Sequence, residues 1–275
     1  MSEQPEPVLA VADLRKVFGQ LVAVDDVSFE VPAGGSFAIV GESGSGKTTI
    51  ARMIVGLEQP TAGVIRACGS DRSAPTRGGA SRRRRGREVQ IVFQDPYSSL
   101  DPRQSVGDAL DEVLRLHHDL DRDRRQARVS ELAALVGLDD RQTRALPRLL
   151  SGGQRQRVAI AKALAAEPRV IILDESVAAL DVSFQAQVLN LLLDIRDETG
   201  VSYVIISHDL AVVRQLTERA IVMRSGQVVE AGPTAQILDD PQHWYTRQLR
   251  ASVPHRGWKP TRRPRSTATQ GSADG

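Results

Sequence analysis

The sequence predicts an α/β fold built on a parallel β-sheet. Short apolar runs typical of buried strands recur along the chain, at residues 37–40, 90–93, 170–173, 203–207 and 220–223. Between them lie segments with helical spacing, as in Ile50, Met53, Ile54 and Leu57, or Val188, Leu191, Leu192 and Ile195. Strands that alternate with helices favour right-handed crossovers, with helices on both faces of the sheet.

Two regions interrupt this alternation. Residues 14–37 are expected to form strand, turn and strand, because apolar residues alternate from Val22 to Val31 and Pro32–Gly35 is typical of a turn, so we expect an antiparallel flank. Residues from about 95 to 166 have a helical pattern. Ser105 can cap a helix carrying Val106 and Leu110, and a second helix carrying Val129 and Leu132 is expected to end near Gly137. We therefore expect a helical insertion.

The 275 residues are predicted to form a single domain over 1–254, followed by a disordered basic tail over 255–275 that is rich in Pro, Arg, Ser, Thr and Gly. The single cysteine, Cys68, excludes an internal disulfide and favours a reducing compartment. No run of 18 apolar residues is present, and the N-terminus is polar, so neither a membrane span nor a signal peptide is predicted.

The charge balance gives little support to nucleic-acid binding. The formal net charge is +2, and the basic run Arg82–Arg85 has no aromatic residues near it. We expect this run to be a solvated loop and predict no nucleic-acid partner.

A glycine-rich motif follows the strand at 37–40. Its spacing, G-x-x-x-x-G-K-[ST], lies between a strand and a helix, as a phosphate-binding P-loop requires. The glycines let successive backbone N–H groups point at phosphate, Lys47 would reach the β- and γ-phosphates, and the Thr48 hydroxyl would bind Mg²⁺. Only 4 of the 36 basic residues are lysine, yet one stands here. The alternative is a glycine-rich turn without a ligand. The predicted nucleotide contacts are Gly41, Glu42, Ser43, Gly44, Ser45, Gly46, Lys47, Thr48 and Thr49.

Two acids follow the apolar strand at 170–173. Burial explains the aliphatic residues but not Asp174 and Glu175. Alone, such a pair would be typical of a solvated loop. Downstream of a P-loop, the pair instead indicates a metal-binding Asp174 and a Glu175 that acts as general base toward water.

These two motifs are shared by kinases, GTPases, helicases and transport ATPases, so they indicate nucleotide hydrolysis or transfer but do not identify the class of protein. The segment Leu150–Gln154, Leu-Ser-Gly-Gly-Gln, discriminates between them. By itself it would be a helix cap and turn. It resembles the signature of ATP-binding cassette (ABC) ATPases, whose core is a P-loop NTPase (RecA-like) fold. That resemblance implies that two subunits pack head to tail, so that Ser151, Gly152, Gly153 and Gln154 of one subunit close over the γ-phosphate bound by the other.

Further positions are assigned by the same resemblance. Gln94 is similar to the Q-loop glutamine, which contacts the Mg²⁺ site and senses the membrane partner, and His208 to the switch histidine near the γ-phosphate. Asp181 is similar to the D-loop aspartate that links the two sites. Phe18 stands where the family usually has a tyrosine stacked on adenine, although core packing would also explain it.

Three segments, at 94–103, 181–190 and 245–254, resemble the dipeptide, oligopeptide and nickel importer group. The resemblance implies an ATPase that uses ATP and Mg²⁺ to energise import, with di- or oligopeptides as cargo. It implies a homodimer or a heterodimer with a second ABC ATPase, two integral membrane permease subunits and, indirectly, an extracytoplasmic solute-binding protein. The chain would lie in the cytoplasm, on the inner face of the cell membrane.

Alternative functions remain open at this point. Within the family they are an ABC ATPase for nickel or another small solute, a subunit associated with phosphonate breakdown, and a soluble ABC ATPase that acts on ribosomes or DNA. A small-molecule kinase would also have a P-loop, but it has no use for Leu150–Gln154.

Overall fold

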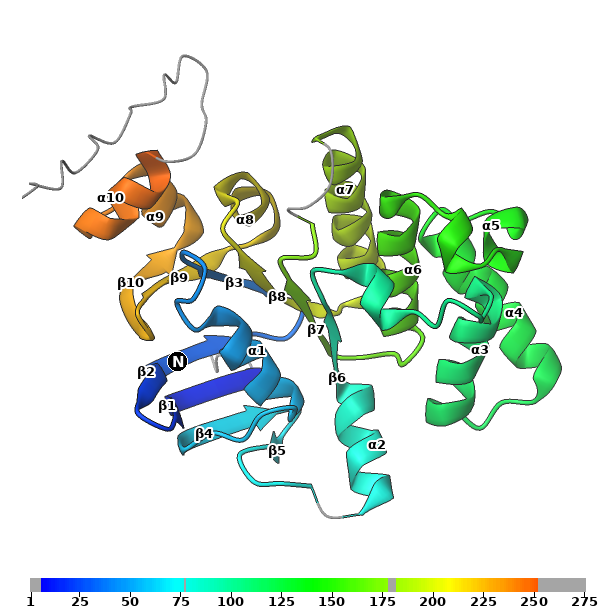
Figure 1. The fold of residues 1–275 in the computed structure, drawn as a ribbon, viewed down its shortest axis with the longest axis horizontal. Coiled ribbons are helices and arrows are strands. Elements are labelled where there is room, and N and C mark those ends of the chain that lie inside the picture. The colour runs from blue at the N-terminus through cyan, green and yellow to red at the C-terminus, as the bar shows by residue number, and fades with distance from the viewer. Residues whose placement is uncertain (1–5, 77, 178–181, 252–275) are drawn as a thin grey trace, which may run out of the picture.

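The computed structural model describes residues 6–76, 78–177 and 182–251. Its strands form two sheets (Figure 1). The core sheet has the order β10-β9-β3-β8-β7-β6, in which only the β10–β9 pair is antiparallel. These strands are β3 (Ser36–Val40), β6 (Val89–Val92), β7 (Val170–Asp174), β8 (Ser202–Ser207), β9 (Arg219–Arg224) and β10 (Gln227–Pro233). The predicted α/β class and parallel core are confirmed.

The second sheet is the antiparallel flank, with the order β2-β1-β4-β5. Its strands are β1 (Leu9–Phe18), β2 (Leu21–Val31), β4 (Ala62–Ala67) and β5 (Ser70–Asp71). The flank was predicted, but its hairpin was placed wrongly. The tight turn lies between Phe18 and Leu21, which pair with each other. Pro32–Gly35 does turn the chain, since the Gly35 N–H donates to the Pro32 carbonyl (3.1 Å), but it leads from one sheet into the other.

Helices cover both faces of the core sheet and form the insertion (Figure 1). Helices α3 to α6 pack at one end of the molecule, between β6 and β7 in the sequence, as the predicted insertion requires. Ser105 caps α3 by accepting from the Asp108 N–H (3.2 Å). The described helices are α1 (Lys47–Val55), α2 (Gly79–Glu88), η1 (Pro96–Ser99), α3 (Val106–His117), α4 (Arg122–Leu135), α5 (Asp140–Arg144), η2 (Pro147–Leu149), α6 (Gly152–Leu164), α7 (Val182–Thr199), α8 (Leu210–Leu216), α9 (Thr234–Asp239) and α10 (Trp244–Ala251).

Strict alternation along the central strands divides the apolar core. On β8, Tyr203 and Ile205 face the helices of the insertion, α3 to α6, together with α7. Val204 and Ile206 face the other way, toward α1 and the antiparallel flank. Because side chains of a strand alternate between its faces, each central strand is buried on both sides. Helix α1 is consequently held between the two sheets.

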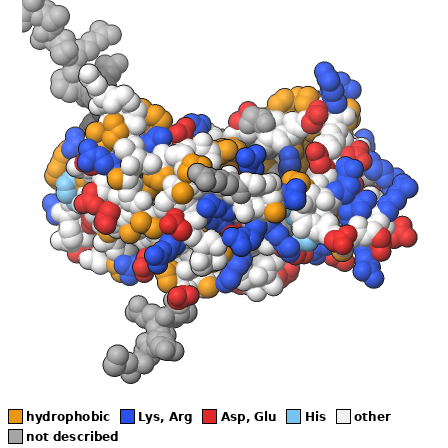
Figure 2. All heavy atoms as spheres, turned by 90° about the horizontal axis from the view of Figure 1, so that it is seen from below, with side chains coloured by type: hydrophobic (Ala, Val, Ile, Leu, Met, Phe, Trp, Pro, Cys, Tyr) orange, Lys and Arg blue, Asp and Glu red, His pale blue; other side chains and the backbone are white. Residues whose placement is uncertain are grey.

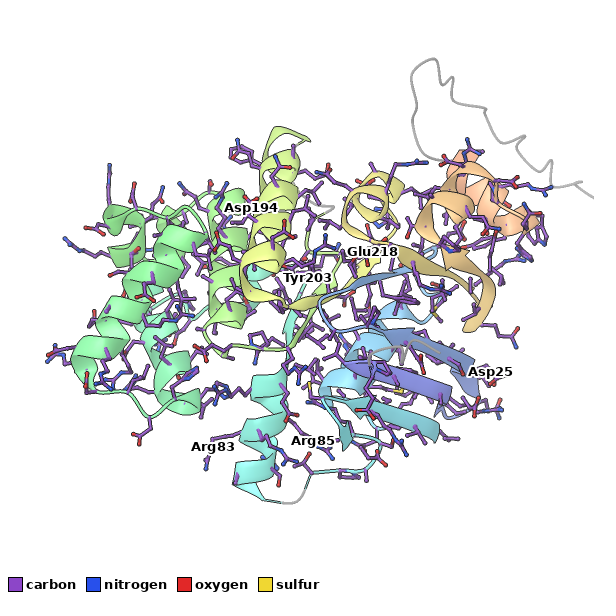
Figure 3. All side chains as sticks on the ribbon, turned by 180° about the vertical axis from the view of Figure 1, so that it is seen from behind. Asp25, Arg83, Arg85, Asp194, Tyr203 and Glu218 are labelled. Carbon is purple, nitrogen blue, oxygen red and sulfur yellow. The ribbon has the colours of Figure 1, made fainter. Side chains whose placement is uncertain are left out.

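The basic run Arg82–Arg85 is helical, and our prediction of a loop there was wrong. It lies in α2, where Arg85 donates to the carbonyls of Ala74 (2.9 Å) and Asp71 (2.7 Å). Figure 3 labels Arg83 and Arg85 on this helix. Arginine has a good helix propensity and no proline interrupts the run, so a polar helix is favoured. Figure 2 shows the molecule from below the view of Figure 1, and many Lys and Arg side chains lie on the face that it shows, with Asp and Glu side chains between them.

Two other predictions concern the end of α1 and the C-terminal tail. Leu57 lies beyond the end of α1, because Gly56 ends that helix in a left-handed conformation. The predicted tail, 255–275, lies outside the described residues, and the predicted limits of the domain stay predictions. Within the residues described, no helix is both long enough and apolar enough to span a bilayer.

Candidate functional site

Chemically active side chains converge at the carboxyl edge of the core sheet. The neighbouring strands β3, β8 and β7 are parallel, so their carboxyl ends lie side by side. The glycine-rich loop follows β3, Asp174 ends β7 and Glu175 follows it, and His208 follows β8. In open α/β sheets ligands bind at this edge, outside the carboxyl ends of the strands.

The glycine-rich loop depends on glycine at two tightly packed positions. Gly46, just before α1, has a φ of 103°, and a Cβ there would lie 2.4 Å from the Ala23 carbonyl oxygen. A Cβ on Gly41 would lie 2.3 Å from the Met223 carbonyl oxygen. Side chains therefore cannot replace these glycines without moving β2 or β9. The loop is fixed by contacts with other strands as well as by its own sequence.

Lys47 is buried among oxygen atoms at the start of α1. Its side chain is 4% exposed, and its ammonium donates to the carbonyls of Gly41 (2.8 Å) and Glu42 (2.9 Å). Its Nζ lies 3.8 Å from Oε1 of Glu175. Burial lowers the pKa of Lys47, while the carboxylates of Glu175 and Asp174 oppose that shift. The side chain thus presents a poorly hydrated cation, which would exchange backbone carbonyls for the oxygens of an anion at little cost.

Thr48 and Asp174 bring two hard oxygen ligands together. The Thr48 hydroxyl donates to Oδ1 of Asp174 (3.2 Å), and Asp174 is 4% exposed. Burial raises the pKa of Asp174, and the hydrogen bond from Thr48 opposes this. A hydroxyl beside a buried carboxylate suits Mg²⁺, which prefers oxygen ligands and would offset the cost of the buried charge. These residues fit the cation that the sequence predicts.

Glu175 lies between the lysine and the histidine. Its Oε2 lies 3.6 Å from Nδ1 of His208, whose side chain is 57% exposed. The backbone of Glu175 is left-handed, with a φ of 49°, and its N–H donates to the Ile206 carbonyl (2.9 Å). A non-glycine residue in this region is strained by about 1 kcal/mol or more, and such strain occurs often at functional sites. The conformation directs the carboxylate to the edge of the sheet instead of continuing β7.

A cavity of about 470 Å³ lies over this loop. Phe18, which is 43% exposed, forms part of its wall. The Lys16 ammonium lies 4.5 Å from the centroid of the Phe18 ring. The lining residues are Phe18, Leu21, Val22, Ala23, Ser43, Gly44, Gly46, Lys47, Thr48, Thr49, Glu175, Ser225 and Gly226. Cationic, hydroxyl and backbone N–H groups at one end and an aromatic ring in the same cavity fit a nucleoside polyphosphate.

Some predicted site residues lie elsewhere. Ser151 and Gln154 form a capping box at the start of α6, in which the Gln154 N–H donates to the Ser151 hydroxyl (3.2 Å) and the Ser151 N–H to the Gln154 amide oxygen (2.8 Å). None of residues 151–154 lines the cavity over the glycine-rich loop. Gln94 follows β6, is exposed, and does not line that cavity either. Asp181 lies outside the described residues.

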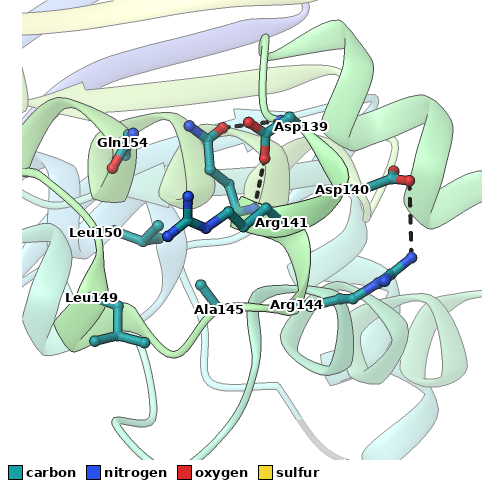
Figure 4. Close-up of a pocket in the computed structure, with 9 residues that line it drawn as sticks. Asp139, Asp140, Arg141, Arg144, Ala145, Leu149, Leu150 and Gln154 are labelled. Atoms are coloured by element: carbon teal, nitrogen blue, oxygen red, sulfur yellow. Dashed lines mark hydrogen bonds and ion pairs between the residues drawn. The ribbon is translucent and has the colours of Figure 1, made fainter.

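Gln154 instead lines a second cavity of about 750 Å³ within the insertion (Figure 4). Figure 4 shows its walls, which consist mainly of α5 and the segment leading to α6; the lining residues are Asp139, Asp140, Arg141, Gln142, Arg144, Ala145, Leu149, Leu150 and Gln154. This cavity is larger, but it lies within the helical insertion and not at the carboxyl edge of the core sheet. Two of its charged side chains, Asp140 and Arg144, pair with each other (3.9 Å). On chemical grounds the smaller cavity is the candidate functional site.

The turn between β9 and β10 is a part of the site that the sequence analysis missed. The Gly226 N–H donates to the Ser45 carbonyl (3.1 Å), and both Ser225 and Gly226 line the cavity. The sequence did contain a signal for this turn, because Ser-Gly after an apolar strand is typical of a tight hairpin with positive φ. The φ values of Ser225 and Gly226 are 49° and 84°.

Comparison with known proteins decides the family. A family model described as "ABC transporter" matches residues 24–178. The chain belongs to the ABC transporter family. It is an ATP-binding ATPase of that family.

Individual relatives and structures agree with this assignment. The chain is 43% identical over 241 residues to the di/tripeptide transport ATP-binding protein of Pseudomonas aeruginosa, covering 88% of this chain and 74% of that protein. It is 45% identical to the oligopeptide transport ATP-binding protein OppD of Mycobacterium tuberculosis, of which it spans 39% while 88% of this chain is covered.

Among solved structures, cbiO1 from Clostridium perfringens, part of an ABC transporter complex, superposes with a TM-score of 0.76 at 27% identity, covering 85% of this chain and 91% of that one. The dimeric post-hydrolysis structure of the ATP-binding cassette MJ0796, bound to ADP and Pi, gives 0.71 at 28% identity, covering 82% and 98%.

The burial of Asp174 leads to a stability prediction. Because its folded-state pKa is raised, the group favours the folded state only when protonated, and this contribution is lost as the pH rises through that pKa. Asp174→Asn keeps an acceptor for Thr48 and removes the charge. The nucleotide-free variant should melt at a higher temperature than the wild type at pH 7, and the difference should shrink as the pH falls through the raised pKa of Asp174.

Circular dichroism melts without nucleotide or Mg²⁺ measure this. Asp140→Asn, at a side chain that is 92% exposed, is the control and should leave the melting temperature unchanged. A lower melting temperature for Asp174→Asn would mean that attraction to Lys47 outweighs the cost of burial.

Proposed function

We propose that this chain is the ATP-hydrolysing subunit of an ABC importer whose cargo is a di- or oligopeptide. The ATPase assignment agrees with the cluster of Lys47, Thr48, Asp174 and Glu175 around one cavity. The cargo class is supported by the relatives, which are named as peptide transport proteins and resemble this chain over 88% of its length.

We assign the predicted residues the following roles. Lys47 and the backbone N–H groups of residues 43–49 would bind the phosphates, and Phe18 would stack on the adenine. Thr48 and Asp174 would hold Mg²⁺, with Gln94 approaching from β6, and the metal would neutralise charge on the phosphates. Glu175 would take a proton from the attacking water, and His208, 3.6 Å from its carboxylate, would hold that carboxylate and the γ-phosphate in place.

The site of one chain is incomplete in this scheme. The Leu150–Gln154 segment opens a helix of 13 residues whose N-terminus suits an anion, yet it lies apart from the cavity of its own chain. We propose that two chains, or this chain and a related ATPase, pack head to tail, so that residues 151–154 of each cover the nucleotide of the other and Asp181 links the two sites. Closing and opening of this pair would drive the permeases.

The remaining partners follow from the importer assignment. Two integral membrane permease subunits would dock on the cytoplasmic side of the membrane, next to Gln94 and the helical insertion. A solute-binding protein outside the membrane would deliver the cargo. With such partners the chain would lie in the cytoplasm at the inner face of the membrane.

Purification of the tagged full chain from its native membranes tests the assignment, with co-purifying proteins identified by mass spectrometry. Permease subunits are the expected partners. In liposomes that hold the complex and its binding protein, a peptide should stimulate ATP hydrolysis. Stimulation by nickel but not by peptides would contradict the cargo, and recovery of ribosomes or DNA without permeases would contradict the transport function.

The proposed general base gives a prediction for Glu175→Gln. The amide cannot accept the proton of water, so turnover should fall by about two orders of magnitude or more while ATP binding is retained. Steady-state hydrolysis and equilibrium binding of ATP measure the two effects. Glu167→Gln is a matched control, since Glu167 also has a left-handed backbone (φ 52°) and precedes the same strand β7 at its opposite end. Near-normal turnover by the Glu175 variant would remove this residue from the role.

The head-to-tail geometry gives a prediction for Ser151→Arg. A large cation at the start of α6 should block closure, so the variant should bind ATP as a monomer yet lose most of its hydrolysis and its ATP-dependent dimer. Loss of the helix cap alone costs about 1 kcal/mol. Ser105→Arg removes an equivalent cap on α3 and serves as the control. Light scattering with ATP, together with hydrolysis rates, measures both effects; unchanged ATPase in the Ser151 variant would refute the shared site.

A further inference from the structure

The C-terminal elements of the chain contact the glycine-rich loop at several points. In Figure 1, α10 lies near β10, the edge strand of the core sheet, which is followed in the sheet by β9 and then β3. The Met223 carbonyl oxygen of β9 packs against Gly41, and the Gly226 N–H holds the Ser45 carbonyl. A third contact comes from a side chain: the hydroxyl of Tyr245, on α10, accepts a hydrogen bond from the Glu42 N–H (3.2 Å).

The peptide group that donates this hydrogen bond also accepts one from Lys47. The N–H of the Gly41–Glu42 peptide donates to Tyr245, and the C=O of the same peptide accepts from the Lys47 ammonium (2.8 Å). One rigid plane therefore connects α10 to the lysine that is proposed to bind phosphate. Glycine permits wide rotation of its backbone, so the bonds at both ends of this peptide add to the packing of Gly41 against Met223 in fixing its orientation.

Tyr245 is itself firmly held. It is 2% exposed, and the Arg224 guanidinium lies 5.3 Å from its ring centroid and 4.5 Å from that of Trp244. The start of α10 is tied to β10, because the carboxylate of Glu230 accepts from the N–H groups of Gln242 (2.8 Å) and His243 (3.2 Å). A buried phenol on an anchored helix is a suitable support for a loop, since its own position costs little further entropy.

We propose that Tyr245 is a positioning residue for nucleotide binding. Its hydroxyl orients the Gly41–Glu42 peptide and so keeps the loop that forms the phosphate cradle in one conformation before ATP arrives. Without the hydroxyl, this peptide loses one of its two anchors, and nucleotide binding must order it. The role rests on the proposed function of Lys47 at the phosphates.

Tyr245→Phe tests the role because it removes only the hydroxyl and keeps the ring. Calorimetric titration of the full chain with ATP and with ADP should show affinities about three- to tenfold weaker, the range expected for one hydrogen bond to a neutral group. Because Tyr245 does not reach the reacting atoms, KM for ATP should rise by a similar factor while kcat stays within about twofold.

Tyr203→Phe is the matched control. The Tyr203 hydroxyl donates to the Leu192 carbonyl of α7 (2.9 Å). Tyr203, labelled in Figure 3, is as buried as Tyr245 and does not line the cavity. Thermal melts should show that this variant also loses stability, whereas its affinity for ATP and ADP should match that of the wild type.

The outcomes separate this role from the proposed function. Unchanged affinity of Tyr245→Phe, or equal weakening in both tyrosine variants, would overturn the positioning role. Lys47→Ala is measured alongside them. If it loses nucleotide binding while Tyr245→Phe does not, only the role of Tyr245 is wrong; if Lys47→Ala binds ATP as the wild type does, the assignment of the cradle itself fails.

Discussion

The buried ammonium of Lys47 is the interaction on which the site depends. A cation removed from water needs partners, and here they are the carbonyls of Gly41 and Glu42 and, at longer range, the carboxylate of Glu175. The carbonyls come from the loop after β3 and the carboxylate from the end of β7. The position of the lysine therefore depends on the curled backbone of the loop. It also depends on β7 lying directly beside β8, with β8 between β7 and β3. The order β3-β8-β7 supplies that arrangement.

The same site is electrostatically costly in the absence of a ligand. Burial raises the pKa of Asp174 and lowers that of Lys47, which means that burial disfavours the charged form of both groups. Their mutual attraction offsets only part of that cost. The left-handed backbone of Glu175 adds strain nearby. A nucleotide would supply the missing counter-charge for Lys47 and the proposed Mg²⁺ that for Asp174, so that binding energy could be coupled to a change of state.

The sequence analysis succeeded where local pattern and burial agree. Strands β3, β7 and β8 are buried on both faces, so their continuous apolar runs were visible without the structure. It failed where pairing is not local. β1 is interrupted by the left-handed Asp13, with a φ of 49°, and loses its alternation, so the hairpin was placed after β2 instead of before it. The motif residues around Lys47 were predicted from spacing alone. Tyr245 was not, because 203 residues separate it from Glu42 and only the fold brings the two together.

The two signature glycines show what a single chain leaves unexplained. A Cβ on Gly153 would lie 3.1 Å from the Phe184 ring of α7, so packing within the chain accounts for glycine there. A Cβ on Gly152 would meet nothing within 4 Å, and its φ is outside the left-handed range. Within the described residues no steric reason therefore requires glycine at the first position of α6, where alanine would be more stable by about 0.5–1 kcal/mol. A glycine kept at such a cost is explained if another molecule closely approaches its backbone. The proposed head-to-tail pair would supply that approach, through the nucleotide that the second chain carries.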